Sequence, residues 1–169
     1  MKKRAAYIIT LFISIASSSC SNSDFDIAPV QQTKTAQVQE SISINGVPTS
    51  KKSDVYSSAK SAEKSSSSFL LQDNKNSSLT ISISNEVRNI KNGSYSFDLK
   101  EVNIEVTNTN NEWSTSKGHQ KGAYFEVISV RNLASNSDYI KEINVKANCF
   151  LYNNEGNFIP FECLTSIKF

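Results

Sequence analysis

From Ser78 onward, apolar and polar residues of this chain alternate with a period of two. Leu79, Ile81 and Ile83 alternate with serine and threonine, and the same pattern returns in later segments up to residue 169. A period of two places successive side chains on opposite faces of a β-strand, whereas an amphipathic helix requires a period near 3.6. Segments rich in Asn, Gly and Ser separate the runs, as turns do. The pattern therefore predicts an all-β domain over residues 78–169, a small antiparallel β-sandwich.

Two segments of this domain show local departures from simple alternation. The apolar side chains stand at odd positions in residues 95–99 but at even positions in residues 102–106. One extra residue in a strand produces such a change of phase, so we predict a β-bulge or a break at Lys100 and Glu101. Residues 123–130 are apolar on both faces. A run of this kind is typical of a central strand that is buried on both sides.

The last two strands form a predicted hairpin that contains two of the three cysteines. If Gly156 lies at the centre of the turn, Cys149 faces Cys163 and both side chains point inward. Directly opposed residues have Cβ atoms about 4.5–5.5 Å apart, close to the ~3.5–4.5 Å that a disulfide requires. The sequence thus predicts a disulfide between Cys149 and Cys163. The alternative is a pair of buried thiols that pack as small apolar groups.

Residues 20–77 differ in composition from the domain that follows them. They are rich in serine, and the run over residues 57–68 is of low complexity. Such a segment buries too little apolar surface to offset its chain entropy, which predicts a disordered tether. Residues 41–48 alternate polar with apolar before an Asn-Gly turn. They form either a short docked strand or a local apolar patch in a disordered chain, and the second interpretation is favoured.

The first 19 residues have the parts of a secretory signal peptide. Residues 2–4 are basic, and the apolar stretch over residues 5–16 leads into small residues. A membrane-spanning helix needs about 20 apolar residues, so this stretch is too short for a permanent span. Without residues 2–4 the chain is close to neutral, because the whole chain has a net charge of only +2.

The segment before Cys20 resembles the lipobox of bacterial lipoproteins. Three serines precede Cys20, although Ser17 stands where these proteins usually have Leu. The resemblance implies that residues 1–19 are removed and that Cys20 becomes the lipid-bearing first residue of the mature protein. Ser21, which replaces the Asp that retains such proteins at the inner membrane, implies sorting to the outer membrane. Ordinary cleavage that leaves a free Cys20 is the alternative.

A second resemblance concerns the domain. Residues 124–133 read YFEVISVRNL, and residues 149–156 read CFLYNNEG. This resembles the bacterial Ig-like domains of the FxLYD kind, in which a strand ending in Asn precedes a second strand and an aromatic-x-Leu-Tyr-Asp-x-x-Gly turn. Cys149 takes the place of the aromatic residue, and Asn153 takes the place of Asp, whose side-chain turn Asn can also make. The resemblance implies an accessory domain of a secreted protein or lipoprotein, with no catalytic role.

The residue inventory argues against most catalytic and metal chemistry. The chain has a single histidine, His119, so no site with two histidine ligands can form. It has only five glycines and no phosphate-binding loop motif. The charge is too balanced for a nucleic-acid-binding protein. We therefore predict no enzyme, no cofactor, no metal site and no nucleic-acid partner.

The longest predicted loop, residues 107–122, holds the candidate binding residues. These are Trp113, Lys117, His119 and Lys121. Long loops on a rigid scaffold often carry function, and an exposed Trp is a good contact residue. Trp113 could equally fold back and cap the edge of the sandwich.

The leading hypothesis is a lipid-anchored, non-enzymatic protein of the cell envelope. It would be held to the membrane, in the outer membrane by the sorting argument, through its N-terminal lipid. It would bind another envelope or secreted protein through its sheet edges or the loop over residues 107–122. The alternatives are an immunity or exclusion lipoprotein that acts against a toxin or a phage, and a small envelope hydrolase.

Overall fold

The computed structural model describes residues 39–55, 64–73, 75–133 and 141–169. They lie within one compact unit, Ala36–Phe169. The signal peptide, Cys20 and the first part of the predicted tether lie outside the described residues. Within them, β-strands dominate and the only helices are two short 3-10 turns, η1 (Val87–Asn89) and η2 (Thr115–Lys117).

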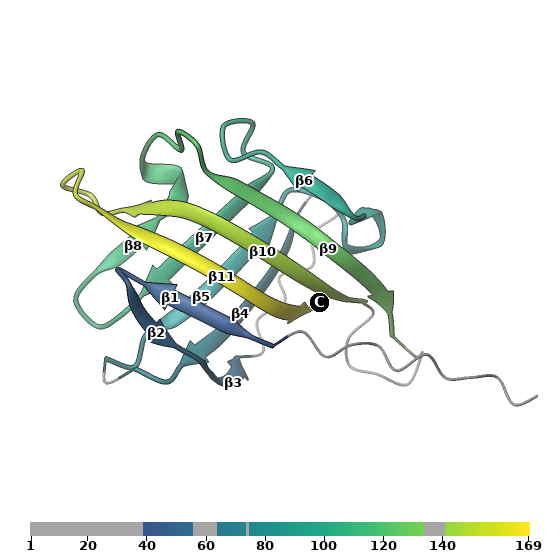
Figure 1. Cartoon of the computed structure of the whole chain (residues 1–169), viewed down its shortest axis with the longest axis horizontal. Helices are drawn as coiled ribbons and strands as arrows, with labels where there is room; N and C mark the ends of the chain where they lie inside the picture. Colours follow the sequence, from purple (N-terminus) through teal and green to yellow (C-terminus); the bar gives the residue numbers. More distant parts are fainter. Residues whose placement is uncertain (1–38, 56–63, 74, 134–140) are drawn as a thin grey trace, which may run out of the picture. The chain divides into compact units, whose positions relative to one another are not determined.

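The strands form two packed layers, as Figure 1 shows. In the first layer the strand order is β3 (Lys51–Val55), β4 (Ser65–Leu71), β5 (Ser78–Ile83), β7 (Val102–Thr107) and β8 (Glu112–Ser114). In the second layer it is β6 (Gly93–Tyr95), β9 (Tyr124–Asn132), β10 (Lys141–Tyr152), β11 (Phe158–Lys168), β1 (Ser41–Ile44) and β2 (Val47–Thr49). Every pairing is antiparallel, and β8 links the layers where Ser114 pairs with Tyr152. The predicted all-β sandwich is confirmed.

The core lies between the layers and is built from the alternating apolar residues. Leu79, Ile81 and Ile83 on β5 are fully buried, as the period of two predicts. The odd-numbered residues of β10 and β11 point inward in the same way. The buried set on these two strands is Lys141, Ile143, Val145, Ala147, Cys149, Leu151, Phe161, Cys163, Thr165 and Ile167. This alternation therefore indicated the inward face of these three strands correctly.

The predicted disordered tether is wrong for the part of residues 20–77 that forms strands. Phe69 and Leu71 on β4 are buried in the core, and so is Ile42 on β1, which pairs with Cys163. The favoured interpretation of residues 41–48 as an undocked patch is thus also wrong. These strands extend the compact unit well before Ser78.

Serine, the residue that suggested disorder, is used in β4 as a strand residue. The hydroxyl of Ser66 lies 2.8 Å from that of Ser82, and the hydroxyl of Ser68 lies 2.8 Å from that of Thr80. These pairs connect β4 to β5 across the outer face of the first layer. Cross-strand hydroxyl pairs of this kind stabilise a sheet. The serine run therefore forms a strand with polar outward side chains rather than a flexible coil.

A polar cluster joins the two layers at the opposite edge from β8. The ammonium group of Lys51 on β3 contacts the carbonyl of Ser166 on β11 and the carboxylate of Glu40. Glu40 also accepts hydrogen bonds from the Ser166 amide at 2.9 Å and the Thr165 hydroxyl at 3.2 Å. Partial burial raises the pKa of Glu40, but these hydrogen bonds and Lys51 outweigh it and leave the pKa below its usual value.

The phase change after Tyr95 is a break between strands. Strand β6 ends at Tyr95, and β7 begins at Val102. Lys100 has a φ of +58° in the intervening turn. The predicted break at Lys100 and Glu101 is confirmed.

The prediction that residues 123–130 form a strand buried on both faces is wrong. Strand β9 pairs with β10, but on its other side only Gly93–Tyr95 pair with it. Phe125 and Val127 point into the core, whereas Tyr124 and Ile128 are 41% and 42% exposed. Strand β9 therefore lies near the edge of its layer, and its second apolar stripe faces outward.

The predicted pairing of Cys149 with Cys163 is wrong by two residues. Cys149 lies opposite Phe161, and Cys163 lies opposite Ala147. The cause is the turn, in which the Gly156 amide donates to the Asn153 carbonyl at 3.2 Å, so that the glycine is the fourth residue of the turn rather than its centre.

Both cysteines are free and buried. Diagonal neighbours on one face of a sheet lie farther apart than a disulfide allows. Burial raises the pKa of the Cys163 thiol to about 12 and raises that of Cys149 as well, with a further contribution from the neighbouring Cys163.

Candidate functional site

The segment between β7 and β9 is the predicted binding loop, and it has more structure than the sequence suggested. It contains β8 and η2, and Trp113 on β8 pairs with Val106 on β7. At the tip, the Asn108 side chain accepts hydrogen bonds from the amides of Asn110 and Asn111, at 3.0 and 2.9 Å. The loop is therefore attached to the first layer along its first half.

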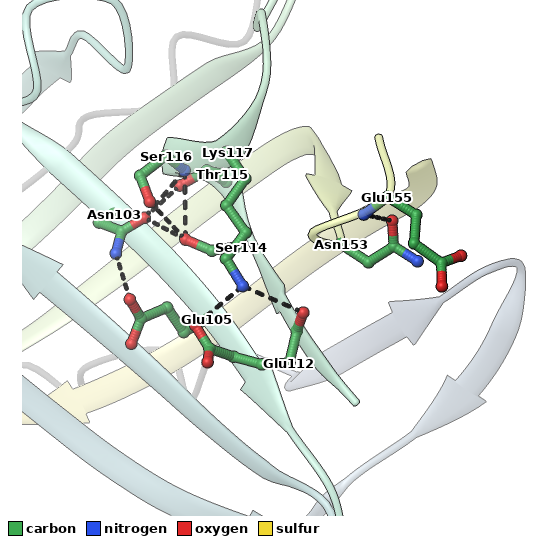
Figure 2. Close-up of polar contacts among 9 residues, drawn as sticks. All are labelled: Asn103, Glu105, Glu112, Ser114, Thr115, Ser116, Lys117, Asn153 and Glu155. Carbon is green, nitrogen blue, oxygen red and sulfur yellow. Dashed lines mark hydrogen bonds and ion pairs between the residues drawn. The ribbon is translucent and has the colours of Figure 1, made fainter. Parts of the chain in front are cut away.

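Asn103 on β7 fixes the start of η2. Its side-chain oxygen accepts from the hydroxyls of Ser114 at 2.9 Å and Thr115 at 2.7 Å, and from the Ser116 amide at 3.2 Å, as Figure 2 shows. The Asn103 amide group donates to Glu105 at 2.8 Å. Because the Ser116 backbone amide can only donate, the contacting atom of Asn103 must be its oxygen. One asparagine side chain thus orients three consecutive residues.

Gln120 holds the end of the same segment against β10. Its side-chain amide donates to the Phe150 carbonyl at 2.7 Å and to the Thr115 carbonyl at 3.0 Å, and its oxygen accepts from the Phe150 amide at 3.1 Å. Gln120 is only 5% exposed. The Gln120 side chain thus bonds both the amide and the carbonyl of Phe150, as the backbone of a neighbouring strand would. The loop is therefore bonded to the second layer.

Gly118 and Tyr152 bring the loop into close contact with β10. A Cβ atom at Gly118 would lie 2.4 Å from atoms of the Tyr152 ring, so no larger residue fits there without movement. The Tyr152 hydroxyl donates to the His119 carbonyl at 2.7 Å. Residues 114–120 are therefore held from both layers of the sandwich.

The turn over residues 96–101 lies opposite this loop and is also closed by hydrogen bonds. The Glu101 amide donates to the Ser96 carbonyl and the Lys100 amide to the Phe97 carbonyl, both at 3.0 Å. This pair of bonds, with a residue of positive φ at Lys100, has the pattern of a Schellman motif, where glycine is the preferred residue. A lysine with this positive φ is less favourable for the backbone than a glycine would be.

The loop and the turn border a pocket of about 500 Å³ that is partly open to solvent, here called the loop cavity. Its size falls within the usual range for small-ligand pockets. Basic side chains line it from three parts of the chain: Lys64, Lys100, Lys117 and His119. Asp98 is the only acidic residue among the described residues that line it. The remaining polar lining comes mainly from the hydroxyl and amide groups of Ser82, Ser84, Asn103, Thr115, Ser116 and Gln120.

Lys117 and His119 each lie beside a carboxylate. The Lys117 ammonium group lies 3.0 Å from the carboxylate of Glu112 (Figure 2). His119 Nδ1 lies 3.8 Å from the carboxylate of Asp98, and both side chains are mostly exposed. Exposed pairs of this kind contribute little free energy, but the carboxylates of Glu112 and Asp98 offset part of the positive charge at the cavity.

The structure separates the four predicted binding residues. Lys117 and His119 line the loop cavity, whereas Lys121 is exposed and is not among its lining residues. Trp113 is partly buried and packs against the core, as expected for the alternative in which it caps the edge of the sandwich. Lys64 and Lys100 also line the cavity, and the sequence did not predict them as site residues. The change in the apolar alternation near Lys100 indicated a break in the strand at this residue, but no sequence pattern relates Lys64 to the loop.

The Asn153 side chain makes the turn that the sequence predicted. Its oxygen accepts from the amides of Glu155 at 3.0 Å and Asn157 at 2.9 Å, and Figure 2 shows the first of these bonds. The turn is exposed and stabilises the hairpin between β10 and β11. It contributes no residue to the loop cavity.

The described ranges contain neither a candidate metal site nor a membrane-spanning helix. Residues 39–55, 64–73, 75–133 and 141–169 contain no group of three or more His, Cys, Asp or Glu residues that could hold a metal ion. In the same ranges, no helix has the length and hydrophobicity needed to cross a membrane.

Comparison with known proteins gives no relative for this chain. No family model, no curated protein and no solved structure matches it. The resemblances to a lipobox and to an FxLYD-like domain therefore stay predictions from the sequence.

Proposed function

We propose that this chain is a lipid-anchored binding protein of the cell envelope, without catalytic activity. Its anchor would be Cys20, acylated after removal of residues 1–19, in the outer membrane of a cell that has one. Its β-sandwich would bind another envelope or secreted protein. The support for the anchor is the short apolar leader that ends in small residues and Cys20.

The single observation that carries the binding role is the fixed loop over residues 114–120. Asn103 and Gln120 each make three hydrogen bonds that hold this loop. A loop that merely connects two strands does not need such support. Holding a loop in one conformation before binding reduces the entropy that binding costs, which favours a contact surface.

The composition of the site supports binding rather than catalysis. His119 is the one histidine of the chain, and its side chain is 75% exposed beside Asp98. The hydroxyls of Ser114 and Thr115 are buried and donate to Asn103, so neither lies beside a general base. Activated nucleophiles require a base within hydrogen-bond reach.

Site-specific photo-crosslinking in living cells tests this proposal. A benzophenone amino acid replaces His119 in the loop or, as the control, Glu126 on the outer face of β9. Both positions are exposed. After irradiation, a discrete adduct at position 119 and none at position 126 is the expected result, and mass spectrometry identifies the partner.

Two results would contradict the proposal. If position 119 gives no adduct under conditions in which the protein is present in the membrane fraction, the loop is not a contact surface. If the protein leaves the membrane fraction in salt washes without detergent, it has no lipid anchor.

A further inference from the structure

The charged side chains at the loop cavity are largely committed to partners within the protein. Lys64 already has a partner, and Lys117 lies 3.0 Å from the carboxylate of Glu112. With histidine counted as neutral, Asp98 and Lys100 are the other charged side chains among the described residues that line the cavity, one of each sign. The lining therefore offers no strong attraction to an ionic ligand of either sign.

Two serine hydroxyls at the cavity use their protons inside the protein. The Ser84 hydroxyl donates to the Lys100 carbonyl at 2.8 Å. The Ser114 hydroxyl donates to Asn103, so in its 2.8 Å contact with Ser116 the proton must come from Ser116. The oxygens of Ser84 and Ser116 therefore keep lone pairs that can accept from a ligand.

Asp98 and Lys100 add one more acceptor and a donor. The Asp98 carboxylate is 65% exposed, and His119 Nδ1 lies 3.8 Å from it, beyond hydrogen-bond distance. A carboxylate only accepts, and an ammonium group such as that of Lys100 only donates. A matching ligand must therefore both donate and accept without a net charge. A hydroxyl is a neutral group that does both through one atom.

Phe97 gives the cavity an apolar surface beside these polar groups. Its ring is half-buried and is held by an edge-to-face contact with Phe125, at 6.4 Å between ring centroids. Small-ligand pockets typically combine apolar surface with a few polar groups that fix orientation. A saccharide ring matches both parts, because its faces carry C–H groups and its edge carries hydroxyls.

We propose that the loop cavity binds a neutral saccharide. Its hydroxyl groups would donate to Ser84, Ser116 and Asp98, and its oxygens would accept from Lys100. The fixed loop forms one wall of the cavity before the saccharide arrives, which lowers the ordering cost of binding. This inference goes beyond the proposed function, which concerns a protein partner, and it depends on neither that partner nor the lipid anchor.

A printed array of neutral, acidic and basic glycans tests the ligand class. The full chain is applied to the array, and bound protein is detected with an antibody raised against it. We expect binding to neutral glycans that changes by less than about twofold when salt is added, because no exposed ion pair carries it. Binding to no neutral glycan, or to acidic glycans alone, would overturn the proposal.

Two variants then locate the binding by calorimetric titration with the neutral oligosaccharide that gives the strongest array signal. Asp98→Ala removes an acceptor of the cavity and should weaken binding about tenfold, the usual loss for one charge-assisted hydrogen bond. Glu126→Ala removes the same charge from the outer face of β9, outside the lining, and should change binding by less than about twofold. Both residues are exposed, and equal melting temperatures show that each variant is folded. Equal affinities of the two variants would overturn the site assignment.

A neutral saccharide would belong either to an envelope polysaccharide or to a glycan on a protein. Competition of the array signal by an envelope extract distinguishes these sources. A polysaccharide still competes after the extract is digested with protease and dialysed, whereas a glycan on a protein is removed with its peptide.

The outcomes also separate this inference from the proposed function. If the array shows no binding to neutral glycans while position 119 still crosslinks to a protein, the saccharide inference is wrong and the proposed function stands. If a neutral glycan binds in an Asp98-dependent way but position 119 gives no protein adduct, the proposed function is wrong and the saccharide inference stands.

Discussion

Replacing Gln120 by Glu should destabilise the protein in a pH-dependent way. The carboxylate keeps one oxygen to accept from the Phe150 amide, but its other oxygen now faces the carbonyls of Phe150 and Thr115. In the wild type these carbonyls accept hydrogen bonds from the side-chain N–H groups of Gln120, at 2.7 and 3.0 Å. Two hydrogen bonds are thus lost at about 1–1.5 kcal/mol each, and a buried charge lies beside two carbonyl dipoles. The expected loss is about 3 kcal/mol at pH 7.5.

The same reasoning gives the direction of the pH dependence. Burial and the two carbonyls disfavour the charged form, so the pKa of the new carboxyl is higher in the folded state than in the unfolded chain, where it is about 4.3. The folded state then binds more protons, and stability relative to wild type falls as the pH rises from about 4 through the raised pKa. At pH 4 the protonated carboxyl donates to one carbonyl, and the loss should shrink to about 1–1.5 kcal/mol.

Thermal unfolding of the full chain at pH 7.5 and pH 4 measures both values. For a unit of this size, 1 kcal/mol corresponds to roughly 4 °C, so the Glu variant should melt about 12 °C below wild type at pH 7.5. Gln120→Met, of similar volume, loses the hydrogen bonds at both pH values and is the matched control. If the Glu and Met variants show the same deficit at both pH values, Gln120 does not bridge the loop to β10 as described.

Three further predictions follow from the packing and electrostatics. Glu40→Gln should cost about 1 kcal/mol or less at pH 7 and less than that at pH 3, because the lowered pKa of Glu40 gives stability that is present above the unfolded value of about 4.3 and is lost as the pH falls through the folded value. Equal costs in urea unfolding at both pH values would contradict this. Without reductant, a maleimide should label Cys149 and Cys163 only after unfolding, whereas a disulfide would leave both unlabelled. Lys100→Gly should raise the free energy of unfolding by about 0.5–1 kcal/mol, and a lower melting temperature would argue against the strained backbone at this position.

The sequence predicted the fold where the signal was local. The alternation of Leu79, Ile81 and Ile83 identified β5 and its buried face, and the phase change identified the break near Lys100. The serine run of β4 was misread because composition alone does not reveal that Ser66 lies opposite Ser82 in a neighbouring strand. The register between neighbouring strands depends on such long-range pairings, so a local sequence pattern does not determine it.

The candidate site was predictable only in part, for the same reason. The length and composition of the loop identified Lys117 and His119. Lys64 and Lys100 line the same cavity only because the start of β4 and the turn over residues 96–101 lie beside the loop in the folded unit. The hydrogen bonds between Gln120 and Phe150 join residues that are 30 positions apart in the chain. No local sequence pattern in either segment predicts this contact.

Hydrogen–deuterium exchange of the free protein tests most directly the claim that residues 114–120 form a fixed part of a binding site. Peptide fragments from three regions are compared: the fixed segment 114–120, the exposed tip near residues 108–111, and β10. We expect the fixed segment to exchange more slowly than the tip, because the Ser116 amide donates to Asn103 of the first layer and the His119 carbonyl accepts from Tyr152 of the second layer. Exchange of residues 114–120 as fast as that of the tip would show a mobile connection and would contradict the account.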